Sequence, residues 1–120
     1  METTIKDNTY IIASKWSRDF ERGDIVVFQT SSKKLVERII ALPGEHLKIT
    51  DGKIYIDDKL LHEPYLASDT VTEGNIDMVL QDDEYFVLGD NRGSSHDSRN
   101  FGVVKEANIV GKLLYPNTNN

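Results

Sequence analysis

The stretch Leu47-Lys48-Ile49-Thr50-Asp51-Gly52-Lys53-Ile54-Tyr55-Ile56 decides the fold class of this chain. Apolar and polar residues alternate on both sides of a central Asp-Gly pair, and this pattern is the strongest short-range signal for a β-hairpin. The sequence therefore predicts two antiparallel strands, at residues 47–50 and 53–56, joined by a two-residue turn.

Similar strand signals occupy most of the remaining chain. Short runs of β-branched and aromatic residues are bounded by polar turns, and no window of ten or more residues shows a convincing helical period. We expect a mostly β fold of coiled antiparallel sheets or a small barrel, with little helix. Residues 68–77 are expected to be a polar surface segment, and 104–109 have room for one helical turn. Further strands are predicted at residues 10–12, 25–28, 35–40, 59–61, 85–88 and 109–115.

Composition limits the class of protein more than it identifies one. A length of 120 residues with 28% charged residues fits one globular domain, which we place at 1–116, followed by a tail at 117–120. The net charge of −6 argues against a nucleic-acid partner. The absence of cysteine excludes disulfides and thiolate metal sites. No apolar run of about 18 residues is present, and no signal-peptide pattern, so we predict no membrane span within this sequence.

The segment from Gly89 to Gly102 is dense in hydrogen-bonding side chains. It reads either as a solvated polar loop or as a buried polar network that shapes a site. Ser95, His96 and Asp97 do not predict a catalytic triad, because adjacent residues of an extended segment point in different directions. Asp90, His96 and Asp97 match no known metal-ligand spacing, so we predict neither a metal nor a cofactor.

The same segment resembles the signature of the type I signal peptidases, a bacterial family of serine proteases. Gly89-Asp90-Asn91-Arg92, a variable stretch with a serine, Asp97-Ser98-Arg99 and a nearby glycine follow the family order. Three further blocks agree in the same order, so the resemblance covers nearly the whole chain. They are Gly23-Asp24-Ile25-Val26-Val27-Phe28, Arg38-Ile39-Ile40-Ala41-Leu42-Pro43-Gly44-Glu45, and Lys53 to Asp57 with Glu63-Pro64-Tyr65-Leu66.

The resemblance implies a Ser/Lys catalytic dyad, in which a neutral lysine amine takes the proton of a serine hydroxyl. Met1 aligns with the methionine that follows the nucleophile, so the serine would precede the first residue and is absent from this chain. Glu37 stands at the lysine position, and neither Lys33 nor Lys34 is placed to replace that lysine. We therefore expect this chain not to cleave peptides.

Three explanations of Glu37 remain open. The chain is a truncated form of an enzyme, with Glu37 either natural or engineered. Alternatively, it is a non-catalytic homologue that acts as a binding or chaperone module in secretion. In the third case burial raises the pKa of Glu37 enough for it to act as the general base for an upstream serine.

Other site residues follow from the resemblance alone. Ser95 matches the serine that orients the catalytic lysine, and here it has the option of donating to Glu37. Asp97 and Arg99 match a structural ion pair. The loop residues expected to hold the site in shape are Asp90, Asn91, Arg92, Asp97, Ser98 and Arg99.

The implied substrate is the signal peptide of an exported protein, bound as an added β-strand and cut after Ala-x-Ala. Met1, Ile5, Leu35 and Val36 would line the first specificity pocket, and Val27 with Val36 the third. Burial in a plain core explains Val27 equally well.

The family also implies a membrane location. A single-pass anchor, absent from this chain, would hold the domain on the extracytoplasmic side of a bacterium. Trp16 and Phe20 are candidates for an apolar rim on the lipid surface, or alternatively for a cover of the core. The short stretch after Leu66 resembles the smaller Gram-positive members, which lack a large inserted domain.

Overall fold

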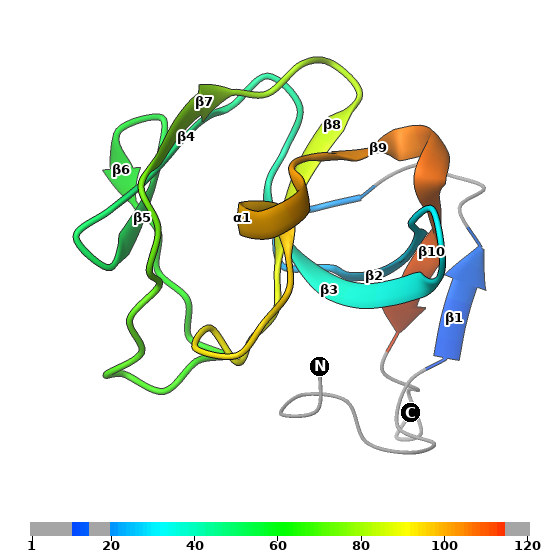
Figure 1. Ribbon diagram of the computed structural model, residues 1–120, viewed down its shortest axis with the longest axis horizontal. Helices are drawn as coiled ribbons and strands as arrows, with labels where there is room; N and C mark the ends of the chain where they lie inside the picture. Colours follow the sequence, from blue (N-terminus) through cyan, green and yellow to red (C-terminus); the bar gives the residue numbers. More distant parts are fainter. Residues whose placement is uncertain (1–10, 15–19, 115–120) are drawn as a thin grey trace, which may run out of the picture.

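The computed structural model describes residues 11–14 and 20–114, which form two antiparallel sheets and very little helix (Figure 1). The predicted fold class of coiled antiparallel sheets is confirmed. The larger sheet has the order β1 (Ile11–Ser14), β10 (Ile109–Leu114), β2 (Ile25–Gln29), β3 (Lys34–Ala41), β8 (Glu84–Leu88) and β9 (Val104–Lys105). The smaller sheet has the order β6 (Lys59–Leu60), β5 (Lys53–Ile56), β4 (His46–Thr50) and β7 (Ile76–Val79). The helical pieces are α1 (Ser98–Phe101) and the 3-10 turn η1 (Glu106–Asn108).

The hairpin predicted around Asp51-Gly52 is present as β4 and β5. Thr50 pairs with Lys53, which leaves a two-residue turn between the strands. Asp51 has φ 53° and Gly52 has φ 79°. A type I′ turn needs positive φ at both central residues, and its twist matches that of the strands it joins. The local sequence therefore accounts for this turn completely.

Two elements depart from the sequence prediction. The strand β7 begins at Ile76, inside the segment expected to be an irregular polar surface, and pairs with β4 at the edge of the smaller sheet. Its side chains are only partly buried or exposed, so its apolar pattern is weak. The helix α1 has four residues, which is too short to show a helical period. The single turn expected within 104–109 is present as η1.

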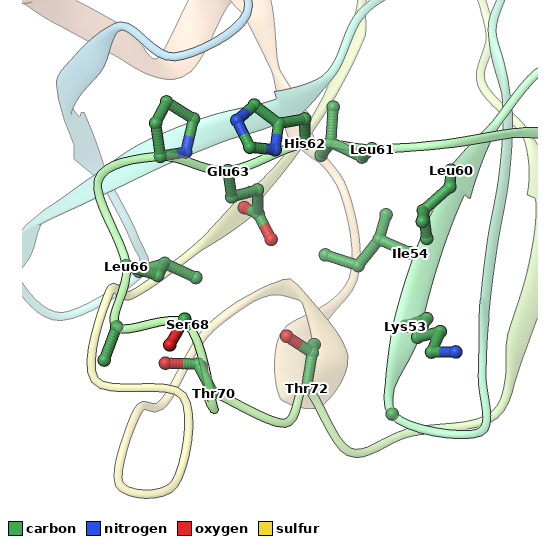
Figure 2. A pocket seen from close by; sticks show the side chains of 13 residues that line it. Lys53, Ile54, Leu60, Leu61, His62, Glu63, Leu66, Ser68, Thr70 and Thr72 are labelled. Carbon is green, nitrogen blue, oxygen red and sulfur yellow. The ribbon is translucent and has the colours of Figure 1, made fainter.

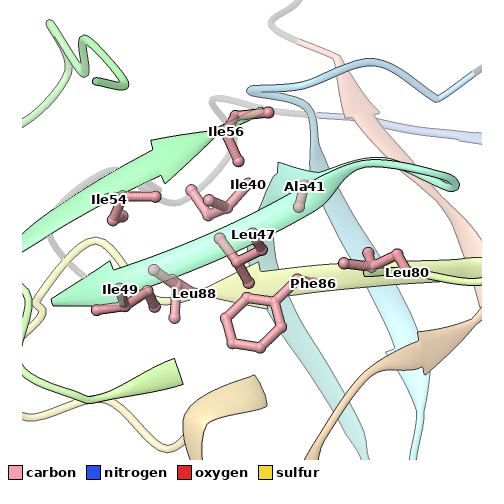
Figure 3. Close-up of a cluster of buried hydrophobic side chains, with 9 residues drawn as sticks. All are labelled: Ile40, Ala41, Leu47, Ile49, Ile54, Ile56, Leu80, Phe86 and Leu88. Carbon is pink, nitrogen blue, oxygen red and sulfur yellow. The ribbon is translucent and has the colours of Figure 1, made fainter. Parts of the chain in front are cut away.

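β3 and β8 are shared between two hydrophobic cores, which explains their nearly continuous apolar runs. Successive residues of β8 alternate between the cores, because neighbouring side chains of a strand point to opposite faces. The first core lies between the two sheets (Figure 3) and contains Ile40, Ala41, Leu47, Ile49, Ile54, Ile56, Leu80, Phe86 and Leu88. The second lies within the coil of the larger sheet and contains Phe20, Val26, Phe28, Ile39, Tyr85, Val87, Val104 and Ile109.

Phe20 belongs to the second core. Its side chain is only 8% exposed, and its ring meets the ring of Tyr85 edge-on with centroids 5.8 Å apart. Of the two roles left open for Phe20, the structure supports the cover of the core rather than the lipid-facing rim, because its apolar surface is already covered by protein. Trp16, the other rim candidate, lies outside the described residues.

Replacing Leu47 by alanine should destabilise the domain by about 2–5 kcal/mol, because Leu47 is fully buried between the sheets and its removal leaves a cavity. The matched control is Leu60→Ala on β6 of the same sheet, where the side chain is 61% exposed. That change should cost no more than about 0.5 kcal/mol. Urea denaturation would measure both, and equal losses would contradict the assignment of the core.

Candidate functional site

Glu37 lies inside the fold rather than on its surface. It sits on β3 directly opposite Val26 of β2, which is fully buried, and its own side chain is only 5% exposed. Its Oε1 atom is buried and has no hydrogen-bond partner. An unpaired buried polar atom costs about 1–3 kcal/mol, so this carboxyl group lowers the stability of the domain.

Burial raises the pKa of Glu37 from its ordinary value of 4.5 to about 8, and the negative charge of Asp97 adds to the rise. Burial acts on Asp97 in the same direction, but hydrogen bonds from Arg99 and Ser95 outweigh it and hold the pKa of Asp97 below its usual range. The pKa values of the two carboxyl groups are therefore shifted in opposite directions. At neutral pH, Glu37 mostly keeps its proton, and Asp97 carries the charge.

The carboxylate of Asp97 organises the polar loop between β8 and β9. It is fully buried and accepts from the guanidinium of Arg99 through Nε at 3.0 Å and Nη2 at 2.9 Å. It also accepts from the Ser95 hydroxyl at 2.7 Å, from the Gly89 amide at 3.3 Å and from the Arg99 amide at 3.0 Å. The last contact makes Asp97 the N-cap of α1. The ion pair predicted between Asp97 and Arg99 is therefore present.

Ser95 is held between Gly89 and Asp97. Its Oγ accepts from the Gly89 amide at 3.1 Å and donates to Asp97. A hydroxyl has one proton, so Ser95 does not donate to Glu37, and that expectation is wrong. A Cβ on Gly89 would lie 2.2 Å from Ser95 Oγ. The first glycine of the signature is thus required by this close approach.

Ser98 ties the same loop to the sheet. Its side chain is buried, and its Oγ accepts from the backbone amide of Val87 on β8 at 2.9 Å. His96 and Asn91 are exposed, and the ring of His96 lies against Phe101 with centroids 5.4 Å apart. The loop is therefore neither a plain solvated segment nor a triad, but a buried network with an exposed outer edge.

Arg38, which follows Glu37 in the sequence, forms a buried ion pair with Asp90. Arg38 Nε donates to Asp90 Oδ1 at 2.9 Å, and Nη2 donates to Oδ2 at 2.7 Å. Nη1 donates to the carbonyl of Gly23 at 2.9 Å, and the guanidinium lies 3.8 Å from the centre of the Tyr65 ring. The pair joins β3 to the start of the polar loop.

Arg92 is anchored to a segment that local sequence reasoning did not connect with it. Its guanidinium donates to both carboxylate oxygens of Glu63, at 3.0 and 2.7 Å, and to Thr72 Oγ1 at 2.9 Å. Nε donates to the carbonyl of Gly89 at 2.8 Å. Glu63 lies 29 residues away in the sequence, so no short motif could have identified it as the partner.

The substrate-pocket residues predicted on β2 and β3 lie on two different faces. Val27 and Val36 are direct cross-strand neighbours and share a face of the sheet. Leu35 points to the opposite face, where it packs against the second core. Met1 and Ile5 lie outside the described residues. Their joint roles in substrate binding remain predictions.

A pocket of about 460 Å³ lies on the smaller sheet (Figure 2), and Glu37 is not among its lining residues. It is bounded by β5, β6 and the segment from Leu61 to Thr72. Its one carboxylate, that of Glu63, is already paired with Arg92. Glu37 and Asp97, the carboxyl groups whose shifted pKa values are described above, do not line this pocket. We therefore take the surroundings of Glu37 as the candidate site. Among the described residues, no group of three or more His, Asp or Glu side chains is placed to hold a metal ion.

Replacing Gly89 by alanine should destabilise the domain by about 2 kcal/mol or more, because the new methyl group must displace Ser95 and disturb the bonds around Asp97. Gly93→Ala in the same loop is the control, since a Cβ there meets no atom within 4 Å. Thermal unfolding would compare the two variants. A loss in Gly89→Ala no larger than in Gly93→Ala would refute the packing argument.

Glu37 should make stability fall as pH rises. Its pKa is raised in the folded state, so its contribution is favourable below its unfolded value of 4.5 and is lost as pH rises to about 8. We expect Glu37→Gln to gain stability relative to the parent across this window, by an amount on the order of 3 kcal/mol at pH 9. Asp82→Asn, at an exposed carboxylate, is the control and should show no such pH-dependent gain. Parallel stability curves of Glu37→Gln and the parent between pH 5 and 9 would contradict the prediction.

Comparison with known proteins indicates the family of this chain. The model of the family described as "Signal peptidase, peptidase S26" matches residues 1–116. Signal peptidase I U of Bacillus subtilis (strain 168) is 38% identical over 97% of this chain and 71% of its own length. The probable signal peptidase I-2 of Synechocystis sp. is also 38% identical, over 95% of this chain but 57% of its own length. The chain thus spans only part of each relative.

A solved structure shows the same fold. The crystal structure of a signal peptidase I from Enterococcus faecalis V583 superposes with a TM-score of 0.70 and 31% sequence identity. The match covers 80% of this chain and 97% of the other. With the family model matching nearly the whole sequence and the fold shared with this relative, the chain belongs to the signal peptidase family, peptidase S26.

Proposed function

We propose that this chain binds the signal peptides of exported proteins as an added β-strand and, with Glu37 at the lysine position, does not cleave them. The observation that carries this proposal is the buried carboxyl group of Glu37, whose Oε1 has no partner. Family membership supports the substrate class. The open edge of β3 supports the mode of binding, and the charge at Glu37 supports the lack of cleavage.

The strand β3 has a backbone edge suited to peptide addition. It pairs with β2 from Lys34 to Arg38, whereas β8 pairs with it only from Arg38 onward. The amide of Ile39 donates to the carbonyl of Asp24, and the carbonyl of Ile39 accepts from the amide of Gly23, so both groups face the β2 side. Antiparallel strands alternate the direction of these groups, so Val36 directs its own amide and carbonyl away from β2. No described strand pairs with Val36 on that side.

The charge at the site disfavours peptide cleavage. In a Ser/Lys dyad the base starts neutral and becomes positive as the serine attacks, which offsets the developing oxyanion. The carboxyl group of Glu37 mostly holds its proton at neutral pH. Once ionised, it would add a negative charge beside Asp97 and oppose the oxyanion.

We place the domain on the extracytoplasmic side of a bacterial membrane, where signal peptides of exported proteins emerge. The Bacillus relatives favour a Gram-positive source. No helix within the described residues is long and apolar enough to cross a membrane.

The full-length gene product should bind a labelled leader peptide ending in Ala-x-Ala, measured by fluorescence anisotropy, without producing a cleaved product in mass spectrometry. Val36→Pro should abolish binding and keep the fold, because its amide faces the open edge and proline removes that donor. Val36→Ala is the control and should retain binding.

Three outcomes of the binding and cleavage assays would change the conclusion. Cleavage by the unaltered protein that is lost in Glu37→Gln would show that the carboxylate acts as a general base. Cleavage by Glu37→Lys alone would show a competent enzyme scaffold that Glu37 silences. No binding by any form would overturn the proposed function.

A further inference from the structure

Lys34, the first residue of β3, lies at the start of the proposed peptide-binding edge. Its side chain is exposed, and it shares a face of the sheet with Val36 and Arg38, because every second residue of a strand points the same way. Arg38 is already bound to Asp90 through two hydrogen bonds. Among the described residues, no hydrogen bond or salt bridge joins Lys34 to a carboxylate. Lys34 therefore brings a positive charge without a described counter-ion to the face of Val36.

The backbone of Lys34 also faces the open edge of β3. Across the turn, the carbonyl of Lys33 accepts from the amide of Thr30, so Lys33 is directed toward β2. Since the direction of these groups alternates along an antiparallel strand, Lys34 and Val36 both direct their amide and carbonyl groups away from β2. On that side β8 pairs with β3 only from Arg38 onward. A peptide strand bound at this edge would therefore pair with Lys34 as well as with Val36.

The described side chains around Lys34 are uncharged or positive. Gln29, directly opposite on β2, uses its side-chain amide to donate to the carbonyls of Thr30 and Lys33, at 2.8 and 3.1 Å. Val27, two residues before it on the same face of β2, is apolar. Lys33 is exposed and adds a second positive charge at the turn. Although the chain has a net charge of −6, this end of the open edge is therefore locally positive.

We propose that the peptide bound at this edge presents an acidic side chain opposite Lys34, two residues along the peptide from the one opposite Val36. The proposal rests on the proposed function and names a side chain that selects among the peptides. Residues directly opposite on neighbouring strands share a face, with Cβ atoms about 4.5–5.5 Å apart, so a carboxylate there reaches the ammonium group of Lys34. A basic side chain at the same position meets a like charge and is disfavoured.

The exposure of Lys34 sets the size and the salt dependence of this preference. An exposed cross-strand ion pair is a weak interaction, so the expected gain in affinity is about two- to fivefold. It should shrink at about 1 M salt, where screening acts over roughly 3 Å. A lysine on an edge strand also discourages pairing with other sheet edges, but that role involves no preference for an acidic partner.

The test uses extended peptides ending in Ala-x-Ala in which glutamate, glutamine and lysine are exchanged at each position in turn. With the full-length gene product at low salt, fluorescence anisotropy should show that glutamate at one position binds about two- to fivefold more tightly than glutamine, and lysine more weakly. In Lys34→Glu the order should reverse at that position, and in Lys34→Gln the preference should disappear. Lys59→Glu, the same charge change at an exposed lysine of β6, is the control and should keep the order of the parent.

The outcomes separate the two proposals. Equal binding of the three peptides at every position, or a glutamate preference that survives in Lys34→Glu, overturns the pairing with Lys34 and leaves the peptide-binding function standing. A preference that does not weaken at about 1 M salt overturns an exposed ion pair as its cause. Failure of all peptides to bind the parent protein overturns the proposed function itself.

Discussion

The structure of the candidate site depends on one constraint, the burial of the Asp97 carboxylate. A buried charge is tolerated only when hydrogen bonds replace its water. Arg99, Ser95 and the amide of Gly89 supply them, and the same carboxylate caps α1. Because these partners come from both ends of the polar loop, satisfying one carboxylate fixes the path of the whole segment. The position of Ser95 and the need for glycine at 89 are consequences.

The arginines of the site connect this network to β3 and to the segment that follows β6. Arg38 joins β3 to Asp90 and lies against Tyr65, while Arg92 joins the polar loop to Glu63. Each guanidinium meets a carboxylate through two hydrogen bonds, so direction as well as distance is set. Removal of one partner would leave a buried charge without compensation, which costs more than the pair itself contributes. The main effect of the network is to fix the relative positions of the polar loop and β3.

Glu37 lies beside this network, and its carboxyl group influences the charge of the site. The network around Asp97 is complete without a cation at position 37, and the protonated state of Glu37 avoids a second negative charge next to Asp97. The fold therefore tolerates the carboxyl group at a cost in stability. In the proposed function, the open edge of β3 receives the peptide while the carboxyl group of Glu37 sets the charge beside it.

The sequence by itself determined the local structure. Alternation around Asp51-Gly52 was sufficient for the hairpin, because a type I′ turn is set by two neighbouring residues. The ordered motifs also identified the family and singled out Glu37. Only the tertiary structure decided the rest. The burial of Phe20 in the second core and the pairing of Arg92 with Glu63 depend on segments distant in the chain. Burial and the field of neighbouring charges exist only after those segments meet, and they set the pKa of Glu37.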